Sequence, residues 1–343
     1  MMHRLQSENV RLSPEDEYTH PVGEEKNFNE SMYFNVFDHE TLFGGWFRIG
    51  NRPNEGHAEM SICLYQPDGS AGFMFDRPAI TGNDAFAAGG MNIKVIEPFK
   101  NLHLSYSGKL CFMKNPLAMA NPRKAFTENP IIECEVDLSF DGIAPLYGGE
   151  ILNDDGTPIT LDAENSFGRA HYEQHVSGKG LIRVGDTEWK VDGLGIRDHS
   201  WGPRYWQAVH YYRWLPMNFD KDFGIMIMQV GMQDGSRSSI GMVLRDNEYV
   251  FIEEARIESE WDKFYNQTGL KAWIRTKERD YEISGRVLSL VPLRNRRAKP
   301  DGEYLLTRIA EGMTEYTCDG KVGYGMSEYL DQIVDGKPVG ADI

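Results

Sequence analysis

The sequence predicts an all-β protein made of two antiparallel barrel or curved-sheet domains, with few short helices. Glycine and aromatic residues are abundant, with 35 Gly and 12% aromatic residues in 343, while amphipathic helical windows are scarce. Asp-Gly and Asp-Asn turn signals recur between runs of β-forming residues. Long strands joined by short hairpins favour a barrel or a strongly curved sheet, because closure removes exposed strand edges.

Runs that alternate apolar and polar residues, or are rich in β-formers, mark the expected strands. Two of them lie in the first half of the chain, at 101–113 and 131–142. From Phe223 onward the pattern is typical of an antiparallel meander with tight turns. The runs of this meander span 223–232, 238–261, 270–291 and 304–316.

Three segments between these runs lack strand character. Residues 79–92, rich in Gly and Ala, predict a loop or a short helix. Residues 112–130 contain three prolines and predict a long irregular insertion, which either covers a pocket mouth or forms a disordered surface excursion. Residues 151–168 are the best candidate for a linker.

A chain of 343 residues with 41% hydrophobic residues has enough apolar material for two domains. We expect a flexible N-terminal arm at 1–25, a first β domain at 26–165 and a second at 166–343. The second domain would carry the motif described below.

Charge and cysteine usage limit the partners and the compartment. The net charge of −16 disfavours nucleic acid and anionic membranes as partners. The four cysteines are scattered without a C-x-x-C pair, which indicates buried free thiols in a reducing compartment. The N-terminus has no apolar signal region, and no run approaches the ~18 apolar residues of a spanning helix. We expect a soluble cytoplasmic protein; a homodimer is compatible with the sequence but has no specific support in it.

Acid, base and large aromatic residues are concentrated in GLGIRDHSWGPRYW, residues 193–206. As a strand, this segment places Arg197, His199 and Trp201 on one face and Asp198 on the other, with Ser200. Adjacent side chains of a strand point to opposite faces, so the consecutive residues Asp198, His199 and Ser200 do not form a hydrolase triad.

Two glycines of the same segment, Gly193 and Gly195, leave space beside Arg197 and His199. Either a ligand or another backbone could approach there. Beyond the strand break at Gly202-Pro203, Arg204 and Trp206 could turn a cation and an indole into the same pocket.

Upstream, HYEQH places His171, Glu173 and His175 on one face of a strand, which invites a metal interpretation. On a flat strand the two outer positions are roughly 13 Å apart, so one ion could take two of the three residues unless the strand bends. We therefore expect no metal site. Pairing of Glu173 with Arg197 or Arg204 is favoured instead.

Downstream, AVHYYRWLPMNF (208–219) supplies Tyr211, Tyr212 and Trp214. Aromatic residues at β spacing usually fill a core, and an arginine among them usually stacks or pairs with a carboxylate. The Asp198–His199 neighbours are more informative, because buried charged groups must be paired and such pairs concentrate at functional sites.

With these segments the chain resembles the bacterial branch of the AttH and carotenoid 1,2-hydratase (hydroxyneurosporene synthase) superfamily of two-domain, lipocalin-like β proteins. The recurrent Asp-His-x-Trp-Gly signature is matched by 198–202, and 46–59 and 323–329 are secondary markers. The resemblance implies two lipocalin-like domains, an apolar cavity and chemistry without a redox cofactor. The chain also shows no dinucleotide fingerprint, P-loop or nucleophile elbow.

Two functions remain open. The first is a cofactor-independent lyase, hydratase or isomerase acting on a hydrophobic aromatic or terpenoid molecule, with loss of water or of a small aldehyde. His199 is its candidate acid–base, oriented by Asp198 or Glu173, and Arg204 is the candidate anion holder. The candidate substrate-binding residues are Arg197, Trp201, Trp206, Tyr211, Tyr212, Trp214 and His171. The second function is a lipocalin-like carrier of an apolar ligand, in which the same cluster is structural.

Overall fold

The computed structural model describes residues 9–299 and 302–341. The chain divides into two compact units. The first comprises the described residues up to 114 together with 128–205, and the second comprises 115–127 together with the described residues from 206. Antiparallel strands dominate both units, which confirms the all-β prediction.

The first unit is one large antiparallel sheet with short 3-10 turns. Its elements are β1 (Val10–Arg11), η2 (Pro14–Glu17), β2 (Phe28–Phe37), β3 (Gly44–Arg52), η3 (Pro53–Glu55), β4 (His57–Tyr65), β5 (Ala71–Asp76), β6 (Phe86–Ala88), β7 (Met91–Glu97), β8 (Asn101–Met113), β9 (Ile131–Gly142), β10 (Tyr147–Ile151), η5 (Ala163–Asn165), β11 (Ala170–Val184) and β12 (Thr187–Pro203).

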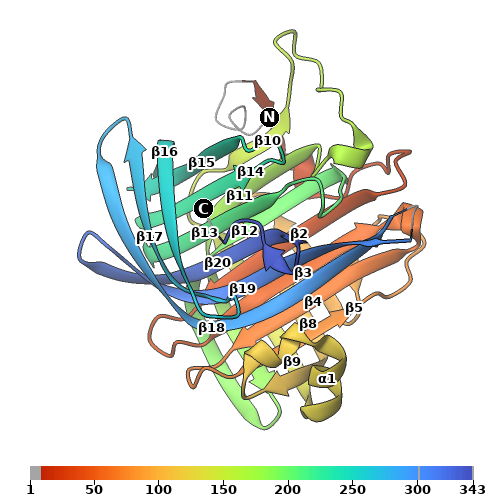
Figure 1. Ribbon diagram of the computed structural model, residues 1–343, viewed down its shortest axis with the longest axis vertical. Coiled ribbons are helices and arrows are strands. Elements are labelled where there is room, and N and C mark those ends of the chain that lie inside the picture. The colour runs from red at the N-terminus through yellow and green to blue at the C-terminus, as the bar shows by residue number, and fades with distance from the viewer. Residues whose placement is uncertain (1–8, 300–301, 342–343) are drawn as a thin grey trace. The chain divides into compact units, whose positions relative to one another are not determined.

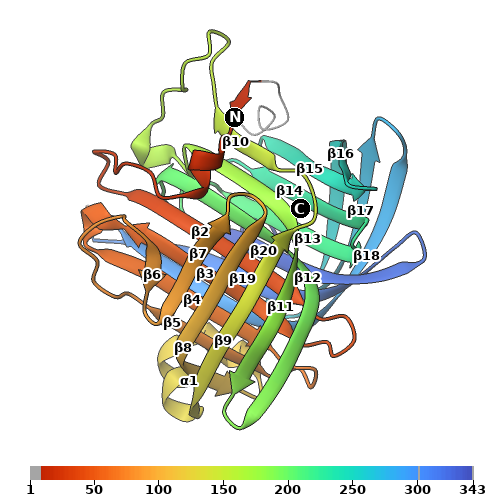
Figure 2. The same cartoon turned by 180° about the vertical axis from the view of Figure 1, so that it is seen from behind.

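Strand β9 closes this sheet, because it pairs with both β8 and β11. The ring of pairings runs through β11, β12, β2, β3, β4, β5, β8 and β9. Figure 2 shows β12, β11, β9 and β8 next to one another. The burial of β9 alternates along its length, so that Cys134, Val136, Leu138 and Phe140 enter the core cluster of the unit.

The second unit is a closed antiparallel barrel. Its elements are η4 (Pro116–Ala120), α1 (Pro122–Glu128), β13 (Tyr211–Asp220), β14 (Phe223–Gly231), β15 (Arg237–Arg245), β16 (Glu248–Trp261), β17 (Gln267–Thr276), β18 (Asp280–Ala298), β19 (Tyr304–Cys318), β20 (Lys321–Val334) and β21 (Lys337–Pro338). Each strand from β13 to β20 pairs with the next, and β13 also pairs with β20. Figure 1 shows β16, β17 and β18 of this meander side by side.

The predicted runs coincide closely with these strands. Runs 101–113 and 131–142 are β8 and β9, and the meander from Phe223 is confirmed. Two of its hairpin turns, at Asp246-Asn247 and Asp319-Gly320, have positive φ at both central residues. This is the turn conformation that matches the twist of paired strands. The four cysteines are free and buried, as expected.

The division between the units differs from the expected boundary at 165/166. Strands β11 and β12, which carry the HYEQH and Asp-His-x-Trp-Gly segments, pair with β2, β9 and β10 of the first sheet. The chain passes to the second unit only after Tyr205. Residues 151–168 therefore lie inside the first unit and are not the linker.

Three other expectations are corrected. Within the predicted arm at 1–25, residues 1–8 lie outside the described residues, but Val10–Arg11 pairs with β10 and Glu17 is fully buried. Residues 79–92 contain β6 and the start of β7, which form a hairpin. Residues 112–130 contain the η4 and α1 helices, so this insertion has regular structure.

The space beside the two motif glycines is filled by another backbone. A Cβ built on Gly195 would lie 1.8 Å from the carbonyl oxygen of Asn35, and one on Gly193 would lie 2.5 Å from that of Phe37. Both neighbours belong to β2, which pairs with β12. Of the two occupants considered, a ligand or a backbone, the structure shows the backbone.

Gly195→Ala should therefore force β12 and β2 apart. We expect the free energy of unfolding to fall by about 1–3 kcal/mol, as for other overpacked sites. Urea denaturation measures the change, with Asp192→Ala, an exposed position of the same strand, as the control that stays near the wild type. An unchanged denaturation midpoint for Gly195→Ala would contradict this close approach.

Candidate functional site

One face of β12 gathers the charged and aromatic residues of the motif. Arg197, His199 and Trp201 lie directly opposite Gln174, Tyr172 and Ala170 of β11. Residues that face each other in an antiparallel pair point to the same side of the sheet. The predicted shared face of Arg197, His199 and Trp201 is therefore present, and Tyr172 joins it.

A short N-terminal segment supplies further charged side chains to this face. Pro14 opens the 3-10 turn η2, and the carboxylate of Asp16 accepts the backbone N–H of Ser13 at 2.7 Å. The turn directs Glu17 inward, where none of its side chain is exposed. His20 follows and stacks its ring on Trp201, with centroids 3.8 Å apart.

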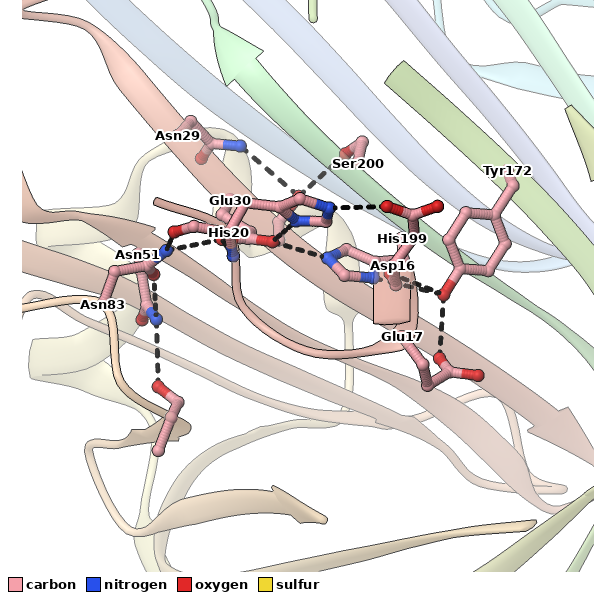
Figure 3. Close-up of polar contacts among 12 residues, drawn as sticks. Asp16, Glu17, His20, Asn29, Glu30, Asn51, Asn83, Tyr172, His199 and Ser200 are labelled. Atoms are coloured by element: carbon pink, nitrogen blue, oxygen red, sulfur yellow. Dashed lines mark hydrogen bonds and ion pairs between the residues drawn. The ribbon is translucent and has the colours of Figure 1, made fainter. Parts of the chain in front are cut away.

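Glu30 of β2 is the centre of the cluster (Figure 3). Its Oε1 lies 2.6 Å from Nδ1 of His20 and 3.0 Å from Nε2 of His199. Its Oε2 accepts the backbone N–H of His20 and the side-chain amide of Asn83. Burial acts to raise the pKa of Glu30, but the hydrogen bonds and charges of His199 and His20 outweigh it and lower the pKa from 4.5 to about 2.

Glu17 is a second carboxylate with four donors. Arg197 binds it through both terminal nitrogens, at 2.7 and 2.9 Å. The hydroxyl of Tyr172 donates to its Oε1 at 2.8 Å, and the backbone N–H of Phe99 donates to its Oε2 at 2.6 Å. Since two carboxylate oxygens offer about four acceptor sites, Glu17 and Glu30 are both satisfied as anions.

Both histidines are held at each ring nitrogen. Nδ1 of His199 lies 3.2 Å from the hydroxyl of Tyr172, and its Nε2 lies 3.0 Å from Oε1 of Glu30. Nδ1 of His20 lies 2.6 Å from Oε1 of Glu30, and its Nε2 lies 3.1 Å from Asp16. Each of the three carboxylates of the cluster thus contacts a basic side chain, as burial of charged groups requires.

His20 is the member of the Glu30 triad that reaches the surface. Its side chain is 18% exposed, whereas the side chains of Glu30 and His199 are fully buried. Burial acts to lower the pKa of His20, but the hydrogen bonds and charges of Glu30 and Asp16 outweigh it, so that its pKa is raised above 6.5.

The opposite face of the same two strands holds the other predicted catalytic residues. Glu173 faces Asp198 in the register, and His171 faces Ser200. Nε2 of His171 lies 2.9 Å from Glu173. Arg204 donates to the hydroxyl of Ser200 at 2.7 Å and to the carbonyl of Phe167. Because they point away from His199, neither Asp198 nor Glu173 occupies the orienting position, which Glu30 and Tyr172 fill.

The remaining predicted binding residues belong to the second unit. Tyr211, Tyr212 and Trp214 are buried on β13, and Trp206 lies before it. Tyr212 donates a hydrogen bond to Glu328, and the guanidinium of Arg213 lies 5.1 Å from the centre of the Tyr211 ring. This arginine also pairs with Asp331 at 3.0 Å. These contacts fit the core-packing interpretation of the aromatic run.

His20, Glu30 and His199 are also the described residues whose donor atoms could hold a metal ion, since these atoms lie within 4.8 Å of one another. Two imidazoles and a carboxylate are a donor set that Zn²⁺ accepts. However, 2.6 Å between Nδ1 of His20 and Oε1 of Glu30 is a hydrogen-bond distance. Ligands placed about 2.0–2.2 Å from a tetrahedral ion are farther apart than this. The geometry therefore fits protons between these groups.

Sequence reasoning missed Asp16, Glu17, His20, Glu30 and Tyr172. Signals existed for two of them. Glu30 is a carboxylate in a strand otherwise free of charge, FNESMYFNVF, whose residues are all buried, and a buried carboxylate needs partners. Ser13 followed by Pro14 and acidic residues is a helix-start signal that orders the segment around Glu17. No comparable signal marks His20.

The comparisons with known proteins agree with this architecture. A family model described as a domain of unknown function, DUF7064, matches residues 13–333. No curated protein matches the chain by sequence. Three solved structures share its fold. A protein assigned as an AttH from Nitrosomonas europaea has a TM-score of 0.55 at 11% identity, covering 94% of this chain and 97% of its own.

The other two structures are similarly distant in sequence. CghA has a TM-score of 0.52 at 10% identity, covering 96% of this chain and 97% of its own. Kievitone hydratase from Nectria haematococca has a TM-score of 0.55 at 7% identity, covering 98% of this chain and 96% of its own. The fold expected from the Asp-His-x-Trp-Gly resemblance is thereby confirmed. Among the described residues, no helix has the length and apolar character needed to cross a membrane.

Proposed function

This chain belongs to the DUF7064 family, and on that premise we propose that it is a hydratase or lyase that uses acid–base chemistry on a hydrophobic small molecule. The aromatic or terpenoid class of substrate, with gain or loss of water or release of a small aldehyde, is part of the proposal. The side chains of the protein supply the chemistry without a redox cofactor.

The observation that carries this proposal is the continuous chain of ionisable groups on one face of β12. Hydrogen bonds connect His20, Glu30, His199, Tyr172 and Glu17 in that order. A carrier of apolar ligands needs an apolar surface. In a carrier, five linked ionisable groups would destabilise the fold through the free energy of their desolvation and would not improve binding of the ligand. Groups with shifted pKa values that share protons are what general acid–base catalysis requires.

The surroundings of the chain of groups favour an apolar aromatic substrate. The Phe86 ring meets the His199 ring edge-on at 5.3 Å, and Phe99 meets Tyr172 at 5.8 Å. Trp201 covers one face of His20. Aromatic faces of this kind hold apolar rings and stabilise developing positive charge. One of the proteins that share the fold is by name a hydratase, which supports the same class of reaction.

The test is turnover by the purified protein without added cofactor. Aryl alcohols, aryl ethers and terpenoid alkenes or alcohols are the probes, and mass spectrometry in H₂¹⁸O detects exchange, gain or loss of water, while a formaldehyde assay detects aldehyde release. We expect turnover by the wild type, and a rate lower by about 10²–10⁴-fold for His199→Gln.

The matched control is His103→Gln. His103 also pairs with a carboxylate, Asp137, at 3.2 Å, but on the exposed side of β8. This variant should keep the wild-type rate. Absence of turnover by the wild type on every probe class would remove the proposed function.

One observation favours the second candidate, a carrier. His199 is fully buried and both its ring nitrogens are hydrogen-bonded, as in a structural cluster. In that case His199→Ala would lower the free energy of unfolding by a few kcal/mol through lost packing and an orphaned carboxylate. Binding of an apolar probe would then be measurable in a protein that turns over none of the substrates.

A further inference from the structure

We propose that His20, supplied by the N-terminal segment and stacked on Trp201, is the general acid that meets the substrate, with His199 as a positioning residue behind it. The inference rests on the proposed function and names the reacting group of that site. Four observations carry it: the exposure of the ring, its two carboxylate partners, its stacking on Trp201 and the burial of His199.

Access distinguishes the two imidazoles. His199 is sealed, with Nδ1 held by Tyr172 and Nε2 by Glu30. His20 is held by Glu30 at Nδ1, on its inner edge, while Nε2 lies 3.1 Å from Asp16, whose side chain is 21% exposed. His20 is therefore the histidine that a substrate can approach from outside, where it would replace Asp16 as the partner of Nε2; His199 cannot be reached without displacing the segment.

Charged groups on every element around His20 keep its ring an acid. Asp16 of η2 and Glu30 of β2 accept its two N–H groups. His199 of β12 is the facing basic residue, with ring centroids 5.8 Å apart, and its Nε2 is already hydrogen-bonded to Glu30. Asn83, in the loop before β6, holds the segment by donating to the carbonyl oxygen of His20 at 2.9 Å. The two carboxylate partners favour the imidazolium form of His20.

Trp201 fixes the plane of this ring. The two rings are stacked at an interplanar angle of 14°, and Trp201 is 6% exposed. The indole face stabilises the positive charge on the imidazole and limits its rotation about the stack. The edge that carries Nε2 is thereby held toward Asp16, whose side chain is 21% exposed.

With His20 as the general acid, the reaction begins with protonation of the substrate. In the dehydration direction, the Nε2 proton of His20 passes to the substrate hydroxyl oxygen, the C–O bond breaks, and water leaves with both bonding electrons. The adjacent carbon then loses a proton to the neutral Nε2, the C–H electrons form the alkene, and the imidazolium is restored. The reverse sequence adds water to an alkene. No oxidant, reductant or other reactant is needed.

The experiment compares His20→Gln with His103→Gln on a tertiary allylic terpene alcohol and a benzylic alcohol. We expect His20→Gln to lose about 10²–10⁴-fold in kcat and His103→Gln to match the wild type. Circular dichroism and melting temperature verify that both variants are folded. A second variant, Asp16→Asn, removes one carboxylate partner and should move the alkaline limb of the pH–rate profile to lower pH, which a purely structural role would not do.

Nitrogen NMR of the histidine rings in the whole protein gives a readout that does not depend on turnover. We expect the His20 ring to be imidazolium at pH 7. A neutral His20 at that pH, a wild-type rate in His20→Gln, or an unmoved alkaline limb in Asp16→Asn would each overturn the proposal. Loss of turnover in the wild type itself would remove the proposed function and this role together, whereas turnover in both the wild type and His20→Gln removes only the role of His20.

Discussion

Replacing Glu17 by Ala is expected to lower the free energy of unfolding of the first unit by about 3–5 kcal/mol. Glu17 and Arg197 are both fully buried, and Glu17 also accepts from Tyr172 and from the backbone of Phe99. The substitution leaves a buried guanidinium and two further donors without their acceptor. Such an uncompensated charge is far more destabilising than the loss of the pair itself. Urea denaturation at pH 7 measures the change.

A double variant separates these two contributions. Glu17→Leu combined with Arg197→Met removes both charges, and it should recover most of the stability, because two apolar side chains leave no orphaned charge. The surface pair of Arg183 with Glu135 is the matched control, and Glu135→Gln should have little effect. A loss below about 1 kcal/mol in Glu17→Ala would show that the segment around η2 does not seal Arg197.

The second large effect is the acid sensitivity that Glu30 confers. Its pKa is lowered from 4.5 to about 2, so the folded state favours the charged form. The stability this provides is fully present above about pH 4.5 and is lost as the pH falls toward 2. A shift of this size corresponds to about 3 kcal/mol. Glu30→Gln should therefore be less stable than the wild type by about this amount at neutral pH, with a flatter profile between pH 4.5 and 2.

The buried Glu59 provides the control for this profile. Its pKa is also lowered to about 2, with burial outweighed by Arg52, Arg48 and Arg77. Glu59→Gln should remove the loss of stability at low pH that is due to Glu59 and leave the loss that is due to Glu30 unchanged.

At high pH, His20 has the opposite effect. Its raised pKa adds stability that is present below pH 6.5 and is lost as the pH rises through the pKa of the folded state. Glu30→Gln should weaken that alkaline loss as well, since Glu30 is a main partner of His20. If the stability of Glu30→Gln depended on pH between 4.5 and 2 in the same way as that of the wild type, the assigned role of Glu30 would be contradicted.

The sequence predicted much of the architecture, because strand and turn signals are local. Period-2 alternation located β8 and β9, and Asp-Asn and Asp-Gly pairs located hairpin turns. The Asp-His-x-Trp-Gly segment was correctly expected to form a strand, but the strand does not break at Gly202-Pro203: both residues still pair with β2, and β12 ends at Pro203. Its division into two faces also followed from the sequence, because successive side chains of a strand alternate.

What the sequence could not provide was the set of partners across that face. The side chains that bind Arg197 and His199 are those of Glu17, Gln174, Glu30 and Tyr172. Glu17 is 180 positions from Arg197, and Glu30 is 169 positions from His199. Strand pairing decides which β strand lies beside β12, and the pairing of β12 with β2 brought Glu30 there in place of Glu173 or Asp198.

The sequence by itself therefore determined β8, β9, the meander from Phe223 with its turns, and the sidedness of the motif, because these depend on residues only a few positions apart. The tertiary structure alone decided that a polar N-terminal segment becomes a buried wall, with Glu17 inside and His20 at the surface. The physical reason is that a buried arginine and a buried imidazole both need carboxylate partners. The fold brings these partners from distant parts of the chain, so no periodic pattern in the sequence reveals them.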